Sequence, residues 1–292
     1  MTAVWRGMTQ EELDRAYNQA AYAPNMAEVV ARYARNSEAV RSRIGEPRRF
    51  SYGEGEKEGL DVFSPAETGS GAPIHVFLHG GAWRSGAARD YAFPAEVFVN
   101  AGAHFVVVDF DWVQDHGGDL MPIADQVRRA IAWIARNAAT FGGNPDEIHV
   151  TGHSSGAHLA GVALTTDWEA GFGLPQRVIR TALLCSGLYD LTPVRLSARS
   201  SYVSFTDASV HALSPLFHLD KITVPVTVAF GTKETPEFKR QAIVFEEALA
   251  RRRQLTGLVV GSDLNHFEIL ETLVDPRGLL GMAALGGMGI GY

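Results

Sequence analysis

Cysteine is almost absent from this sequence, since Cys185 is the only one among 292 residues. An intramolecular disulfide and a thiolate zinc cluster are therefore excluded. The chain also lacks an apolar run of about 18 residues, which a membrane-spanning helix needs. Its first residues form a charged helical pattern without the apolar stretch of a signal peptide. We therefore expect no membrane span and a cytoplasmic location.

Positive charge is in short supply as well. Lys and Arg number 26 against 33 Asp and Glu, which gives a formal net charge of −7. Nucleic acid is therefore not expected as a partner, because the chain lacks the basic footprint that a phosphate backbone requires. The histidines show no spacing typical of metal ligands, so no metal site is expected. A hydrophobic fraction of 46% with 20% charged residues excludes intrinsic disorder and predicts a sizeable core.

Short apolar segments alternate with amphipathic helical patterns through most of the chain. A hairpin is expected over residues 50–63, where a glycine turn separates two extended segments. Fully apolar strands between such helices predict an α/β fold with a mostly parallel central sheet and helices on both faces. The strands are predicted at residues 74–78, 105–108, 148–151, 179–185, 224–230 and 255–260, and helices over residues 123–134, directly after 154, and from 235 to 249.

One domain is predicted over the whole chain of 292 residues, because no linker divides it. Residues 1–45 are predicted to form N-terminal helices, with start signals at Thr9 and Asn25. Residues 191–222 break the strand–helix rhythm and are predicted to be a short inserted cap. The Gly-rich tail at residues 277–292 is compatible with packing on the body, with an interface in a homo-oligomer, and with a loose end.

The sharpest local feature is a G-x-S-x-G pattern at residues 152–156, placed directly between a predicted strand and a predicted helix. This is the context of a nucleophile elbow, in which a sharp turn projects a serine hydroxyl above the sheet edge. The start of the following helix adds partial positive charge where an oxyanion forms. Ser154 is therefore the candidate nucleophile.

A second glycine motif, His-Gly-Gly-Ala-Trp at residues 79–83, also follows a predicted strand. Glycines at this point let backbone N–H groups face a cavity without a side chain in the way. The N–H groups of Gly80 and Gly81, together with that of Ser155, form the candidate oxyanion hole. The alternative interpretation is a tight strand-to-loop turn beside a buried Trp83.

A serine nucleophile needs a general base, and the base needs an orienting carboxylate. In enzymes with a nucleophile elbow the chain order is serine, acid, histidine. His266 lies just beyond the last predicted strand and is the candidate base. Glu234 follows the preceding strand and is the candidate acid, with Asp263 second and Glu237 as a further rival.

Two aromatic residues are candidates for a substrate pocket. Trp83 ends the second glycine motif, and Tyr189 follows the strand predicted at residues 179–185. An aromatic pocket is one place for both side chains, and the buried core is the alternative. Cys185 lies on an apolar strand and is expected to be an inert packing residue.

Several motifs together resemble the kynurenine formamidase (arylformamidase) branch of the α/β-hydrolases. The resemblance covers nearly the whole chain, from about Leu13 to about Leu270. The motifs are LDRAYNQAAYAPN at 13–25, HGGAW at 79–83, GHSSG at 152–156, SGLYDL at 186–191, GTKETPEFKRQ at 231–241 and NHF at 265–267.

Carried over by position, the resemblance implies an α/β-hydrolase fold with Ser154 as nucleophile, His266 as base and Glu234 as orienting acid. It also implies that Gly80, Gly81 and Ser155 donate to the oxyanion, and that no cofactor is needed. The acid is usually Asp in this family, so the glutamate is a departure in this one position.

We therefore expect a serine hydrolase that cleaves a small aryl amide or ester, as in formyl-kynurenine, through an acyl-enzyme on Ser154. The resembled family's bacterial members include esterases and amidases of other small substrates. A carboxylesterase on short acyl or aryl esters, without formamidase activity, is therefore the alternative. A non-catalytic ligand-binding protein of the same fold is a third interpretation, and it predicts a broken triad or oxyanion loop.

Overall fold

The structure, a computed structural model, describes residues 2–66 and 71–291. Residues 1, 67–70 and 292 lie outside the described part, and they include the first residue of the predicted N-terminal helices and the last residue of the predicted tail. Eight strands form one sheet in the order β1-β2-β4-β3-β5-β6-β7-β8. The strands are β1 Arg48–Ser51, β2 Gly59–Phe63, β3 Ala72–Leu78, β4 His104–Val108, β5 Gly143–His153, β6 Thr181–Cys185, β7 Val226–Gly231 and β8 Leu255–Gly261.

The sheet is parallel from β4 through β8, and β1 and β2 add an antiparallel hairpin at one side. Strands β3 and β4 are buried over nearly their whole length, as expected for strands covered on both faces. The hairpin predicted over residues 50–63 is present as β1 and β2. The prediction of a mostly parallel α/β sheet is therefore confirmed.

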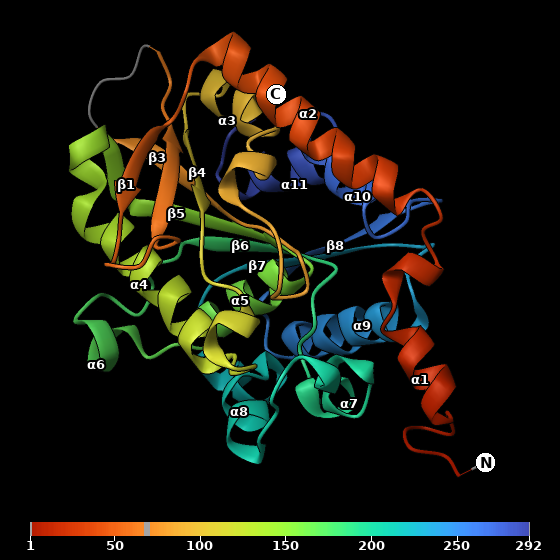
Figure 1. Cartoon of the computed structure of the whole chain (residues 1–292). Coiled ribbons are helices and arrows are strands. Elements are labelled where there is room, and N and C mark those ends of the chain that lie inside the picture. The colour runs from red at the N-terminus through yellow and green to blue at the C-terminus, as the bar shows by residue number, and fades with distance from the viewer. Residues whose placement is uncertain (1, 67–70, 292) are drawn as a thin grey trace.

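Helices cover both faces of the sheet (Figure 1). Helices α2, α3, α10 and α11 cover one face, and α4, α5 and α9 cover the other. The helices are α1 Gln10–Ala16, α2 Met26–Ile44, α3 Ala95–Asn100, α4 Met121–Asn137, α5 Ser155–Leu164, α6 Trp168–Phe172, α7 Leu191–Arg195, α8 Asp207–Ala212, α9 Pro236–Arg251, α10 Glu268–Glu271 and α11 Leu279–Gly287. None of the helices in residues 2–66 and 71–291 is long and apolar enough to cross a membrane.

Local sequence signals explain where several helices begin. Thr9 and Glu12 form the predicted capping box at the start of α1. Thr235 caps α9 with its hydroxyl, and the proline that follows it occupies the first turn, where its missing N–H costs nothing. Asn25 precedes α2 as predicted but makes no side-chain cap, and its Oδ1, the atom that would cap, instead accepts from Asn265 at 2.8 Å.

The strand register decides which loops meet. Leu78 at the end of β3 pairs with Gly152 of β5, so the two glycine motifs leave the sheet side by side. Gly231 of β7 pairs with Gly261 of β8, so the loops that carry the candidate acid and the candidate base also start as neighbours. Because these strands are parallel, all four loops lie at the carboxyl edge of the sheet, where ligand sites collect in α/β proteins.

Two further segments reach this edge. Residues 191–222, the cap segment, contain α7, η5 (Ala198–Ser201), α8 and η6 (Pro215–Lys221). The short helix η1 (Gln19–Ala21) lies between α1 and α2, and its Gln19 contacts the loop that follows β7. The glycine-rich tail forms α11, which packs against β6 and β8.

Candidate active site

Ser154 lies in a strained turn between β5 and α5. Its φ of +56° and ψ of −122° lie in a region that residues with a side chain seldom adopt. The flanking glycines permit the turn: a Cβ on Gly152 would lie 2.4 Å from the carbonyl oxygen of Gly156, and a Cβ on Gly156 would lie 2.0 Å from that of Leu78. The sequence therefore folds here as the predicted elbow, with the serine hydroxyl above the sheet edge.

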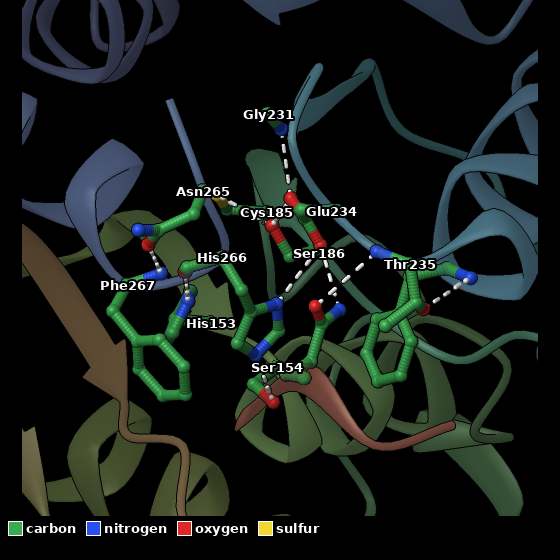
Figure 2. Close-up of polar contacts among 12 residues, drawn as sticks. His153, Ser154, Cys185, Ser186, Gly231, Glu234, Thr235, Asn265, His266 and Phe267 are labelled. Carbon is green, nitrogen blue, oxygen red and sulfur yellow. Dashed lines mark hydrogen bonds and ion pairs between the residues drawn. The ribbon is translucent and has the colours of Figure 1, made fainter. Parts of the chain in front are cut away.

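The hydroxyl of Ser154 points at His266 (Figure 2). Ser154 Oγ lies 2.8 Å from His266 Nε2, although the two residues are 112 positions apart in the chain. His266 is buried and belongs to the loop between β8 and α10. The predicted nucleophile and the predicted base are thus within hydrogen-bond reach of each other.

Glu234 completes a chain of hydrogen bonds. His266 Nδ1 lies 2.9 Å from Glu234 Oε2, while Glu234 Oε1 accepts from the Ser186 hydroxyl at 2.6 Å and from the Gly231 N–H at 2.7 Å. Glu234 is 1% exposed, so these donors replace the water that a buried carboxylate loses. Figure 2 shows the line from Ser154 through His266 to Glu234.

The two rival carboxylates lie elsewhere. Asp263 is 85% exposed and lies 3.5 Å from Lys233 Nζ. Glu237 pairs with Arg240 at 2.7 Å and accepts from a tyrosine hydroxyl. The structure therefore brings Glu234 to His266 and brings neither rival to it.

His153 supports the loop that carries His266. Its Nε2–H donates to the backbone carbonyl of His266 at 2.8 Å, and the two rings lie 4.8 Å apart between centroids. Burial, assisted by the nearby His266, lowers the pKa of His153 to about 3. The His153 ring is therefore neutral at pH 7 and adds no charge beside the base.

The loop that carries two of the predicted oxyanion donors, Gly80 and Gly81, lies beside Ser154. A Cβ on Gly80 would lie 3.1 Å from Ser154 Cβ, which places the glycine loop against the serine. Within the described ranges, the backbone N–H groups of Gly80, Gly81 and Ser155 donate to no other protein group. His79 donates from Nδ1 to the carbonyl of Gly80 at 2.8 Å, so it braces this loop. Three free donors beside a nucleophile are the arrangement that stabilises a developing oxyanion.

Trp83 and Tyr189, the two aromatic candidates for substrate binding, are both buried in the core. Trp83 donates from Nε1 to His158 Nδ1 at 3.1 Å, and Tyr189 stacks on Phe245 with ring centroids 4.1 Å apart. Neither lines the cavity beside Ser154. The structure therefore places both in the core, which is the alternative that the sequence left open for them.

A cavity of about 640 Å³ opens above Ser154 and His266. The N-terminal segment, the glycine loop after β3 and the cap segment form most of its walls. Its aromatic residues include Tyr202 and Phe267, and its charged residues are Asp14, Arg15, Arg84 and Arg199. In the described part of the chain, no group of three or more His, Cys, Asp or Glu side chains is arranged to hold a metal ion.

Several residues of this site escape sequence reasoning. Ser186 is distinguished in the sequence only as part of the SGLYDL motif, which does not predict its φ of +58° just after β6. Gln19 lies in the LDRAYNQAAYAPN motif, which does not say that the residue contacts the acid, and Arg199 lies in none of the motifs. Both reach the site from segments far away in the chain.

The mostly parallel sheet, with a serine elbow after β5 and a histidine loop after β8, defines the chain as an α/β-hydrolase. Comparisons with known proteins agree with this class. The family model described as BD-FAE matches residues 60–177. The chain is also similar to an esterase of Mycobacterium tuberculosis, LipQ, with 29% identity over 68% of this chain and 51% of that protein.

The similarity is more extensive to kynurenine formamidase of Danio rerio. The two chains are 30% identical over 94% of this chain and 95% of the relative. A crystallised candidate thioesterase from Silicibacter sp. TM1040 superposes with a TM-score of 0.80 at 29% identity, over 94% of this chain and 98% of that one. The chain belongs to the kynurenine formamidase family of α/β-hydrolases, and it is a hydrolase.

Proposed function

We propose that this chain is a serine hydrolase in which Ser154 is the nucleophile, His266 the general base and Glu234 the orienting acid. The observation that carries this proposal is the continuous hydrogen-bonded line of these three side chains, which reaches the wall of a cavity large enough for a small aromatic substrate. The order along the chain, serine, acid, histidine, is that of enzymes with a nucleophile elbow.

The first half of the reaction forms an acyl-enzyme. Ser154 Oγ attacks the substrate carbonyl carbon while its proton moves to His266 Nε2. The carbonyl oxygen becomes an oxyanion, which accepts from the N–H groups of Gly80, Gly81 and Ser155. The intermediate then collapses, the bond to the leaving amine or alcohol breaks, and His266 gives its proton to that leaving group.

The second half releases the acid. Water takes the place of the leaving group and gives a proton to His266 as its oxygen attacks the acyl carbon. A second tetrahedral intermediate collapses, Ser154 recovers its proton from His266, and the free carboxylic acid departs. Glu234 keeps the Nδ1–H tautomer of the histidine throughout and stabilises the imidazolium that forms in each half.

The substrate that we favour is an aryl formamide of the formyl-kynurenine type. The identity of 30% with kynurenine formamidase over nearly the whole chain supports this choice. The cavity lining supports it too, because it contains three arginines, Arg15, Arg84 and Arg199, and a single acidic residue, Asp14. None of the three arginines forms an ion pair among the described residues. Guanidinium groups suit a substrate with a carboxylate, and Tyr202 and Phe267 offer faces for its ring.

A carboxylesterase is the second candidate function. The observation in its favour is that relatives and solved structures of similar fold include esterases, such as LipQ and an esterase of Pyrobaculum calidifontis that superposes with a TM-score of 0.70 at 18% identity. An ester has a better leaving group than an amide, so the same machinery would cleave it with a less well placed proton donor. The third interpretation, a non-catalytic binding protein, expects a broken triad, and the convergence of Ser154, His266 and Glu234 argues against it.

The test is kcat/KM for N-formyl-L-kynurenine beside phenyl acetate on one preparation, with Ser154→Ala as the control. A clear preference for the formamide that is lost in the control supports the proposal. Turnover of the ester alone keeps the Ser154 mechanism and replaces the formamidase assignment with a carboxylesterase. No turnover of either substrate, in a protein that also fails to react with a fluorophosphonate, would contradict the serine hydrolase itself.

A further inference from the structure

The N-terminal segment reaches into the hydrogen-bonded line of the active site. Gln19, in η1, is 6% exposed, and its Nε2 donates to Glu234 Oε2 at 3.1 Å. The other end of the same amide, Oε1, accepts from the backbone N–H of Thr235 at 3.3 Å. A single side chain therefore bridges the carboxylate of the acid and the backbone of the next residue.

Gln19 supplies one of four donors to the carboxylate of Glu234. Oε1 accepts from Ser186 and Gly231, and Oε2 accepts from His266 and from Gln19. An ionised carboxylate has about four lone-pair directions, so this set fills it. The donation from Gln19 goes to the same oxygen that faces His266, and it therefore opposes rotation of that oxygen away from the imidazole.

Neighbouring contacts hold Gln19 in place from both sides. Before it, the Tyr17 hydroxyl donates to Glu237 at 3.0 Å. After it, Asn25 Oδ1 accepts from Asn265 at 2.8 Å, next to His266 in the chain. The N-terminal segment thus links the loop of the acid to the loop of the base.

We propose that Gln19 is a positioning residue of the active site, which acts on His266 through Glu234. The proposal rests on the proposed function, since it assigns Gln19 a part in the work of the same triad. It implies that the active site is complete only when the N-terminal segment is seated against the loop after β7. Gln19 itself touches no reacting atom.

The surroundings of Glu234 make this role measurable by a pH profile. The charge of Glu234 also acts on the Cys185 thiol and the Tyr189 hydroxyl, and His153 lies against His266 and is neutral over the assayed range. Burial raises the pKa of the thiol and of the Tyr189 hydroxyl well above their ordinary values, so both groups stay neutral over the pH range of the assay. Gln19 also lines the cavity, so KM separates an effect on substrate binding from an effect through Glu234 and His266.

The experiment compares two variants at this position with a matched control. Gln19→Leu removes the donation, and Gln19→Glu places a second carboxyl against Glu234. Gln10→Leu is the control, because Gln10 is an exposed residue of the same segment that donates to Leu196 at 2.8 Å and to Asp14 at 2.9 Å and does not touch the acid. Each protein is assayed for kcat and KM on phenyl acetate from pH 5 to 9 and for its melting temperature.

We expect Gln19→Leu to lower kcat roughly tenfold to a hundredfold, the range for loss of one hydrogen bond to a charged group, with KM little changed. In Gln19→Glu the two buried carboxyls share one proton at low pH, because like charges in contact disfavour ionisation of both, and the protonated side chain donates to Glu234 as Gln19 does. Its kcat should therefore lie near the wild-type value at pH 5 and fall below it as the pair loses that proton at higher pH. Gln10→Leu should match the wild type in both respects.

Two results would overturn the proposal. One is a folded Gln19→Leu protein with wild-type kcat. The other applies if Gln19→Leu melts early: it is a folded Gln19→Glu protein whose kcat depends on pH as that of the wild type does. The proposed function itself fails if the wild type cleaves neither test substrate and Ser154 takes no fluorophosphonate, and the role of Gln19 then fails with it. That outcome concerns the wild type, so it is distinguishable from the two results for the Gln19 variants.

Discussion

Replacement of Glu234 by Gln is the sharpest perturbation that the site allows, because it keeps the shape of the side chain and removes its charge. Ser186 and Gly231 both donate to Oε1, so the oxygen of the new amide takes that position. Its NH₂ group then faces two donors, His266 Nδ1–H and Gln19 Nε2. His266 relieves this contact by moving its proton to Nε2, where the proton points at the hydroxyl of the nucleophile.

The wrong tautomer cannot accept the proton of Ser154, so the first step is blocked in most molecules. The corresponding change in another Ser-His-Asp triad lowers kcat by about 10⁴. We expect a loss of the same order in kcat/KM for Glu234→Gln, which equals about 5 kcal/mol of transition-state stabilisation at 1.36 kcal/mol per tenfold change. The loss for Glu234→Ala should be smaller than that for His266→Ala, since the base is still present without its orienting acid.

The assay is steady-state hydrolysis of phenyl acetate at pH 7.5, with circular dichroism to check the fold. Asp263→Asn is the matched control, because that side chain is 85% exposed and lies in the same loop as His266. We expect the control to stay within about twofold of the wild type, as surface substitutions usually do. The acid assignment would be refuted if Glu234→Gln stayed within tenfold of the wild type, or if Asp263→Asn were the more damaging change.

Three further predictions follow from other parts of the site. Gly81→Ala should lower kcat/KM about a hundredfold, because Gly81 has a φ of +121° and a Cβ there would lie 2.0 Å from the Ser85 carbonyl oxygen; wild-type kinetics in a folded variant would contradict the oxyanion assignment. Burial lowers the pKa of His153 to about 3 and that of His158 to about 4. The unfolded chain binds these two protons near pH 6.5, and the folded chain does not. The free energy of unfolding, measured by urea titration, should therefore fall by about 2–3 kcal/mol when the pH is lowered from 7.5 to 5.5. A fall of less than about 0.5 kcal/mol would contradict the lowered pKa values. Arg199→Gln should lower kcat/KM for N-formyl-L-kynurenine more than for phenyl acetate, and an equal effect on both would argue against carboxylate recognition by Arg199.

Much of the fold could be predicted from the sequence, because strands buried on both faces read as apolar runs. The strand predicted at residues 148–151 is nevertheless longer in the structure, where β5 begins at Gly143. Its first residues are polar and typical of a turn, and Gly143 joins the sheet by pairing with Ala72 of β3. The six-residue helix α3, Ala95–Asn100, is too short for its periodicity to be read from the sequence.

The meeting of three candidate side chains at one edge of the sheet could be predicted for a related reason. Ser154, Glu234 and His266 each follow a recognisable strand, and parallel strands bring their carboxyl ends to one edge of the sheet. The register that makes them neighbours, with Gly231 opposite Gly261, is a property of the folded sheet.

The remaining contacts could not be predicted, because they join segments without a shared pattern. Gln19 is 215 positions from Glu234, and the motif at 13–25 that contains it gives no sign of a contact with the acid. Trp83 and Tyr189 show a related limit. The sequence near an aromatic residue does not distinguish a substrate pocket from the buried core, because the difference depends on how the side chain packs in the folded chain.

Covalent labelling of the nucleophile tests the central claim, hydrolysis through Ser154, most directly. The folded protein is treated with a fluorophosphonate, and the adduct is located by intact-mass and peptide mass spectrometry, with Ser154→Ala in parallel. The account predicts one adduct per chain on Ser154, loss of turnover in proportion to labelling, and an Ser154→Ala variant that takes no label and has lost on the order of a million-fold in kcat. A folded wild-type protein without an adduct on Ser154, or a variant that labels and turns over like the wild type, would contradict it.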